Sequence, residues 1–112
     1  MSAHSAVRVT GTVHTSRKYS DTRGNAVHEL QLTQGPLSLP VLVRRCFGPS
    51  PAAHMVAGRL EHHYRPRSVA TVTGRALQLD ARRGLLVLLE PDHMEPADTA
   101  AAAARRPALE ET

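Results

Sequence analysis

Residues 68–90 have the sequence SVATVTGRALQLDARRGLLVLLE, which predicts two β-strands joined by a basic tip. The first part is rich in β-branched residues and then alternates leucine with polar residues, and residues 85–89 form a continuous apolar run. The connection, Asp80–Gly84, ends in a glycine that suits a tight loop, and it carries Arg82 and Arg83 side by side. We therefore expect a long β-hairpin whose tip can reach a polyanion.

The length and the cysteine content restrict the class of protein. A chain of 112 residues suits one domain with a modest core. Cys46 is the only cysteine, so neither an intrachain disulfide nor a cysteine zinc cluster is available, and a reducing location fits best. The first residues lack the apolar stretch of a signal peptide, and no apolar run approaches the ~20 residues that span a bilayer. We expect a soluble, cytoplasmic protein with no membrane segment.

Positive charge is concentrated in the body of the chain. Residues 1–89 contain twelve basic and four acidic residues, a net charge of +8, whereas residues 90–112 contain two basic and six acidic residues, a net charge of −4. Thirteen of the fourteen basic residues are arginine, which binds phosphate in a bidentate manner and stacks on bases. The body therefore favours a polyanionic partner, and a solvated basic surface is the plain alternative.

Alternating apolar and polar residues predict three more strands before the hairpin. A polar segment, Thr15–Asn25, is expected to be a loop, and Pro40 indicates an edge or a bulge early in the third strand. Ser50 and Pro51 are typical of a helix start, and Met55, Val56 and Leu60 are expected on the inward face of that helix. The expected elements are strands at Ala6–His14, Ala26–Thr33 and Leu37–Phe47, a helix at Ala52–His62, and the two strands of the hairpin.

This order of elements predicts an all-β fold with one short helix between the third and fourth strands. Five strands with a helix in that position form the OB-fold, a partly open barrel that binds oligonucleotides on one face. We expect this domain to cover residues 1–96, because the strand pattern and the positive charge both end near there. Residues 97–112 are expected to be a flexible, alanine-rich tail.

Several short motifs resemble those of the bacterial single-stranded-DNA-binding proteins. In its compact size the chain resembles the primosomal replication protein N branch of that family. The matching segments, which span about residues 7–95, are Val9–Val13, Gly24–Val27, Cys46–Gly48, Ser68–Arg75 and Val87–Met94. The resemblance implies a homodimer that binds single-stranded DNA in replication, replication restart or recombination, with replication or restart proteins as further partners. The chain departs from that family in having few aromatic residues and in ending without a short acidic tip closed by Pro-Phe.

Arginine and aromatic side chains are the candidate nucleic-acid contacts. Those expected to contact phosphates are Arg17, Lys18 and Arg23 of the first loop, Arg44 and Arg45 of the third strand, Arg65 and Arg67 before the fourth strand, and Arg82 and Arg83 at the tip. Those expected to stack on bases are Tyr19, Phe47 and Tyr64. Phe47 suits the core equally well, and Tyr19 suits packing on its own strand equally well.

No set of residues in the sequence predicts catalysis, a cofactor or a metal site. His62 and His63 are adjacent and would point apart, and His28 is expected to be a hydrogen-bonded core residue. Cys46 and His54 lack an orienting third group, so Cys46 is expected to be a small buried packing residue. We expect a binding protein without enzymatic activity. Two alternatives stay open, which are an OB-fold interaction module that has lost nucleic-acid binding and an RNA-binding OB domain.

Deleting residues 97–112 is expected to leave the melting temperature nearly unchanged, because these residues contain little apolar surface to pack. The deletion should also tighten binding to single-stranded DNA slightly, because it removes net negative charge. Thermal melts and an oligonucleotide titration of the two chains check this prediction. Unfolding of the shortened chain would show that the domain boundary is wrong.

Overall fold

The computed structural model of the chain describes residues 6–97. These residues form one seven-stranded sheet with a helix packed against it. The elements are β1 (Val7–Ser20), β2 (Ala26–Thr33), β3 (Val41–Gly48), α1 (Pro51–His63), β4 (Val69–Gly74), β5 (Leu77–Asp80), β6 (Leu85–Leu89) and β7 (His93–Ala97). The strand order is β5-β6-β3-β2-β1-β4-β7, and only β3 and β6 pair in parallel. Apart from Ala97, the expected tail lies outside the described residues.

The prediction of a five-stranded barrel is wrong, because β5 and β7 are the two edges of an open sheet. Residues 68–90 do not form one long hairpin either. The first strand of the expected hairpin is interrupted after Gly74 and forms two strands, β4 and β5. β4 pairs with β1 and β7, and only β5 pairs with β6 as the hairpin requires. The residue pattern of 68–80 is compatible with a single strand. The strand is nevertheless broken, because residues 69–74 pair near one edge of the sheet and residues 77–80 form the other edge.

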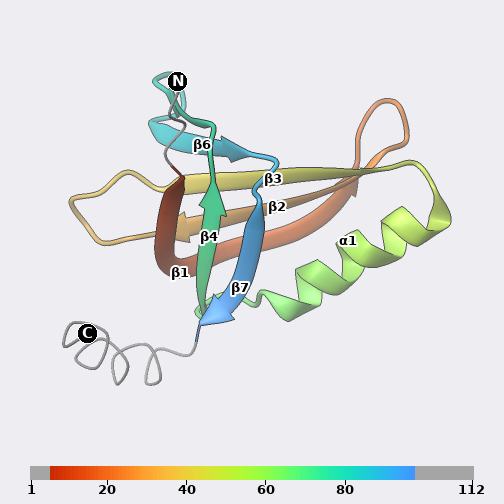
Figure 1. The fold of residues 1–112 in the computed structure, drawn as a ribbon, viewed down its shortest axis with the longest axis horizontal. Coiled ribbons are helices and arrows are strands. Elements are labelled where there is room, and N and C mark those ends of the chain that lie inside the picture. The colour runs from red at the N-terminus through yellow and green to blue at the C-terminus, as the bar shows by residue number, and fades with distance from the viewer. Residues whose placement is uncertain (1–5, 98–112) are drawn as a thin grey trace.

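Strand β1 changes partner along its length, and this makes the sheet curl. Val7–Thr12 pairs with β4, and Thr12–Ser20 pairs with β2 across a register shift between Val13 and Thr15. Figure 1 shows β1 bending as it passes from one partner to the other. A Cβ atom at Gly11 would lie 2.7 Å from the carbonyl oxygen of Thr33, so only glycine allows the two backbones to approach this closely.

The curl encloses the main core, which lies on the inner face of the sheet. Its fully or nearly fully buried residues are Val9, Val13, Leu30, Leu32, Val41, Val43, Tyr64, Ala70, Val72 and Leu88. Strands β4 and β6 are not hydrogen-bonded to each other, but Leu88 fills the space beside Gly74, where a Cβ atom would lie 2.8 Å from Cδ1 of Leu88. β4 and β6 are therefore brought together by side-chain packing, whereas in a closed barrel backbone hydrogen bonds would join them.

The segment predicted as a polar loop, Thr15–Asn25, is mostly strand. β1 continues to Ser20, and only Asp21–Asn25 forms the turn. Both carboxylate oxygens of Asp21 accept hydrogen bonds within this turn, from backbone N–H groups and from the Asn25 amide. Residues 15–20 of β1 are polar because their side chains face a hydrophilic surface on one side and the end of α1 on the other. This part of the strand therefore lacks the apolar alternation of a half-buried strand.

The third strand begins four residues later than expected, at Val41 instead of Leu37. Residues 34–40 form a loop between β2 and β3, and the Leu37 side chain in it is fully exposed. Pro36 and Pro40 remove two backbone donors from this segment, so it cannot continue the ladder.

Helix α1 begins where the sequence predicts, because the Ser50 side chain accepts a hydrogen bond from the Ala53 N–H at 3.0 Å. The helix lies along one side of the long strands (Figure 1). Its inward face was expected to include Met55 and Val56, and this is wrong, because their side chains are 58% and 41% exposed. The buried helix residues are instead Ala53 and Ala57, whose small side chains let the helix backbone approach the sheet. No helix within residues 6–97 is long and apolar enough to cross a membrane.

Replacing Gly11 by alanine is expected to lower the free energy of unfolding by about 1–3 kcal/mol, because the new methyl group would force β1 away from Thr33. Gly58 is the matched control, because it lies within α1 and a Cβ atom there meets nothing within 4 Å. Gly58→Ala should raise the free energy of unfolding by about 0.8–1 kcal/mol. Urea denaturation of both variants checks the prediction, and equal effects of the two changes would contradict it.

Candidate nucleic-acid interface

The outer face of β1, β2, β3 and β6 carries a row of charged side chains that lie opposite one another. In register across the sheet, Arg17 lies beside Glu29, Glu29 lies beside Arg44, and Arg44 lies beside Leu89. The next row consists of Thr15, Gln31, Leu42 and Val87. One row of this face therefore alternates arginine with acid over β1, β2 and β3, and the next row is polar on β1 and β2 and apolar on β3 and β6.

Glu29 is the centre of the hydrogen-bonding network on this face. Its Oε2 accepts a hydrogen bond from the Tyr19 hydroxyl at 2.7 Å, and its Oε1 pairs with Nη2 of Arg17 at 3.3 Å. The Arg17 guanidinium also lies 5.3 Å from the centre of the Tyr19 ring. Partial burial raises the pKa of Tyr19, and the hydrogen bond to Glu29 raises it further. The tyrosine and the arginine are thus held in place by the same carboxylate.

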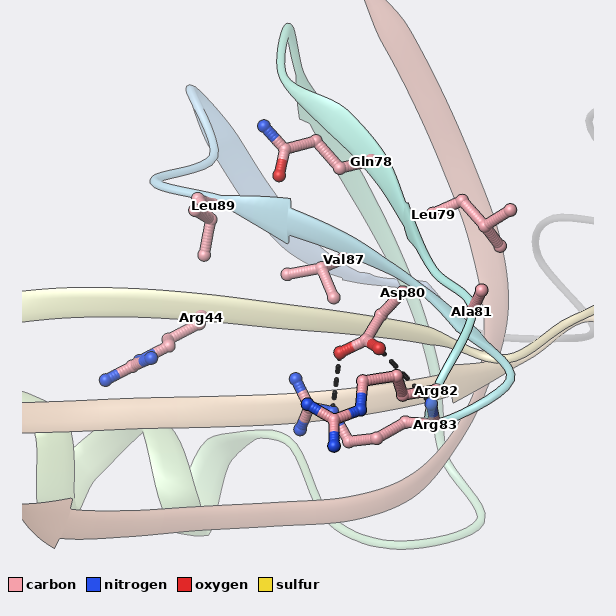
Figure 2. Close-up of a pocket in the computed structure, with 9 residues that line it drawn as sticks. All are labelled: Arg44, Gln78, Leu79, Asp80, Ala81, Arg82, Arg83, Val87 and Leu89. Atoms are coloured by element: carbon pink, nitrogen blue, oxygen red, sulfur yellow. Dashed lines mark hydrogen bonds and ion pairs between the residues drawn. The ribbon is translucent and has the colours of Figure 1, made fainter.

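The β5–β6 hairpin folds its two tip arginines over the same face. Figure 2 shows Asp80, Arg82 and Arg83 close together at the tip of the hairpin, with Leu79 pointing away from them and Arg44 lying apart from them on β3. Nε of Arg83 pairs with Oδ2 of Asp80 at 2.8 Å. These contacts from Arg83 lower the pKa of Asp80. Asp80 therefore holds the Arg83 side chain against the hairpin.

Two shallow depressions meet at Arg83. One of about 400 Å³ lies under the hairpin and is lined by Arg44, Gln78, Leu79, Asp80, Ala81, Arg82, Arg83, Val87 and Leu89. The other, of about 520 Å³, is lined by Thr15, Arg17, Glu29, Gln31, Leu42, Arg83 and Leu85. Leu42 and Leu85 are buried, so the second depression has an apolar floor with polar groups around it. An extended polyanion that carries flat apolar groups would fit such a surface, because its charges could meet the arginines and its flat groups could rest on the apolar floor.

Five of the predicted contacts converge on the outer face, and these are Arg17, Tyr19, Arg44, Arg82 and Arg83. Lys18 and Arg45 lie on the opposite face, because both are in register with the buried His28. Arg45 instead lies over the Phe47 ring at 4.9 Å, and Phe47 packs against the small cluster beneath α1. Arg23 lies in the β1–β2 turn, whereas Arg65 and Arg67 lie between α1 and β4.

Tyr64 cannot stack on a base in this structure, because it is 3% exposed and belongs to the main core. It follows the last residue of α1, its backbone N–H donates to the Leu60 carbonyl oxygen, and its ring packs with the core residues of the sheet. Cys46 was expected to be buried but is exposed, because it lies on the outer face of β3 with the exposed Arg44. Within residues 6–97, no group of three or more His, Cys, Asp or Glu side chains could hold a metal ion.

Glu29, Gln31 and Asp80 line the same depressions, but they are neither cationic nor aromatic, so the sequence did not indicate them as contacts. The alternation of β2 already places Glu29 and Gln31 on one side of the strand. Glu29 and Gln31 lie near the arginines only because β2 pairs with β1 and β3, and the local sequence does not reveal which strands pair.

Solved structures of other proteins share this fold. The SSB domain of a Synechococcus protein matches with a TM-score of 0.59 and 14% identity, over 85% of this chain and 98% of that chain. A small single-stranded DNA-binding protein from Streptomyces coelicolor matches with a TM-score of 0.50 and 16% identity, over 89% of this chain and 98% of that chain. The chain has the fold of an SSB domain. No protein-family model matches the sequence, and no curated protein matches it.

His28 is the buried titratable group beneath this fold, and its prediction as a hydrogen-bonded core residue is confirmed. It is 1% exposed, and its Nε2 lies 3.0 Å from the Ser16 hydroxyl. Burial lowers its pKa from 6.5 to about 4, and the nearby Glu61 and Glu29 only partly oppose this. The imidazole is therefore neutral in the folded protein at neutral pH.

Acidification is expected to destabilise the protein through His28. Between pH 6.5 and about 4 the unfolded chain binds a proton at this residue and the folded chain does not, so the free energy of unfolding falls as the pH falls. The loss should reach about 3 kcal/mol relative to His28→Gln, a variant that keeps a hydrogen-bonding side chain near Ser16. Urea denaturation at several pH values measures the difference. A parallel pH dependence of wild type and variant would contradict it, and His62→Gln, at an exposed position, is the control.

Proposed function

We propose that this protein binds single-stranded DNA on the outer face of β1, β2, β3 and β6. The observation that carries the proposal is the convergence of arginines from three separate segments around two depressions with apolar surface. Arg17 comes from β1, Arg44 from β3, and Arg82 and Arg83 from the hairpin tip. The arginines would hold phosphates, and the apolar surface with Tyr19 would take the bases.

The fold and the charge support this function independently of the site. Solved structures with the same fold include an SSB domain and a small single-stranded DNA-binding protein. The net charge of +8 over residues 1–89 would attract a polyanion over a distance of several ångströms. A single strand also suits the site better than a duplex, because bases must reach the apolar floor.

The ion pairs on this face predict binding of moderate strength. Arg17 and Arg83 are each paired with a carboxylate, and exposed pairs of this kind contribute about 0–1 kcal/mol. A phosphate can therefore compete for these arginines at little cost. Among the described residues 6–97, Tyr19 is the only tyrosine or phenylalanine on this face, and one stacked base contributes about 1–3 kcal/mol. Binding should depend more on phosphate contacts than on stacking.

The finer parts of the proposal come from the family resemblance. They are a non-catalytic, cytoplasmic homodimer of the primosomal replication protein N type, acting in replication, replication restart or recombination. The free edges of β5 and β7 support self-association, because an edge strand offers unpaired backbone groups to a second chain.

A second candidate is an interaction module that keeps the fold without binding nucleic acid. The burial of Tyr64 and the packing of Phe47 favour it, because they leave few rings for stacking. Titrations with labelled single-stranded DNA, duplex and RNA oligomers distinguish the candidates. The module predicts no binding to any of the three.

Changing Arg82 and Arg83 together to alanine is expected to weaken single-strand binding about tenfold and to reduce the magnitude of the salt slope by about one to two. The wild-type slope of log K against log[salt] should be about −3 for four phosphate contacts. The matched control is Arg59→Ala with Arg75→Ala, which removes the same charge from α1 and from the connection between β4 and β5, where no contact is predicted. Equal losses in the two double variants would show that net charge alone drives binding and would remove the hairpin from the site.

A further inference from the structure

An acid lies at the centre of a face that otherwise suits phosphate. The Glu29 side chain is 14% exposed, and it lies between Arg17 and Arg44 in the register of the sheet. Its carboxylate would repel a phosphate group placed on the floor of the larger depression. A DNA backbone is thereby kept at the rim, where Arg17 and Arg83 lie, and its bases are directed toward the floor.

The Glu29 carboxylate has unused capacity to accept hydrogen bonds. A carboxylate offers about four lone-pair sites, and within the described residues two contacts occupy them, from Arg17 and from Tyr19. These contacts also fix its position, which reduces the entropy lost when a ligand binds. Glu29 is therefore a prepositioned acceptor at the wall of the depression.

The same depression supplies an amide and an apolar surface. Gln31 lies two residues after Glu29 and therefore on the same face of β2, and it has both a donor and an acceptor. Leu42 and Leu85 are buried and form the floor. A flat ring can rest on the leucines while its edge meets Glu29 and Gln31. Proteins that bind a base outside its stack hold its face against aromatic or apolar side chains and hydrogen-bond its Watson–Crick edge.

We propose that Glu29 and Gln31 form a base-selective subsite that prefers guanine and disfavours thymine. This inference rests on the single-strand binding proposed above. Guanine has adjacent N1–H and N2–H donors, which one carboxylate can accept together, and its O6 can accept from the Gln31 amide. Thymine has one N3–H donor between two carbonyl oxygens, and these oxygens face the negative charge of Glu29. Cytosine and adenine present a single amino group each and fall between the two.

The test compares labelled oligomers of about ten nucleotides, a length within the range that one OB-fold covers. One probe contains only dT, and three others carry a single central dG, dC or dA. Fluorescence anisotropy with the full-length protein gives the affinity for each. Wild type should bind the dG probe about five- to tenfold more tightly than the all-dT probe, as one bidentate contact provides.

Glu29→Gln keeps the size of the side chain and an acceptor for the Tyr19 hydroxyl but removes the charge. It should bring the dG and dT affinities within about twofold, because a neutral amide can donate to a thymine carbonyl as well as accept from guanine. Glu95→Gln on β7 is the matched control, because it removes the same charge at the opposite edge of the sheet from β5 and should keep the preference. Thermal melts establish that both variants are folded.

The outcomes separate the subsite from the function on which it rests. Equal binding of all four probes by wild type overturns the subsite and leaves single-strand binding in place. A guanine preference that survives in Glu29→Gln also overturns it. If Glu29→Gln does not fold, Gln31→Ala replaces it and should reduce the preference by half or more. Failure of wild type to bind any probe overturns the proposed function together with the subsite.

Discussion

The fold depends on the backbone of β1, which serves two partners at once. The pairing with β4 ends at Thr12 and the pairing with β2 begins there, so β1 passes from one partner to the other at this residue, and Figure 1 shows the strand bending as it does so. Gly11 permits the bend because the Thr33 carbonyl oxygen occupies the position of a side chain. A flat sheet of seven strands would leave both of its faces in water, whereas the curl turns one face into a core that buries residues from five strands, β1, β2, β3, β4 and β6.

The helix completes this core with small residues and one ring. Ala53 and Ala57 lie against Ala26, and the chain then turns so that Tyr64 enters the core where the sheet is open. Ser16 links the two layers, since its hydroxyl lies near His28 and also donates to the Glu61 carbonyl oxygen at 3.4 Å. The polar groups buried here are therefore satisfied, and no buried side-chain polar atom within the described residues lacks a partner.

The outer face combines attraction for a polyanion with local compensation of its charge. Arg17 and Arg83 are held by Glu29 and Asp80, which positions their guanidinium groups before any ligand arrives. Prepositioning lowers the entropy lost on binding, while the competing carboxylates reduce the net attraction. The face is thus a shaped surface and not a uniform basic patch, and its acids give it the means to distinguish one base from another.

The sequence by itself determined the strands with alternating apolar residues, the helix start at Ser50, the burial of His28 and the basic character of the body, because these follow from neighbours along the chain. Only the tertiary structure decided that polar residues 15–20 extend β1, that residues 68–80 divide between two edges of the sheet, and that Tyr64 is buried while Cys46 is exposed. It also placed Glu29 among the arginines. The physical reason is that strand pairing and curvature are contacts between distant segments, and the pattern within one segment does not specify its partner.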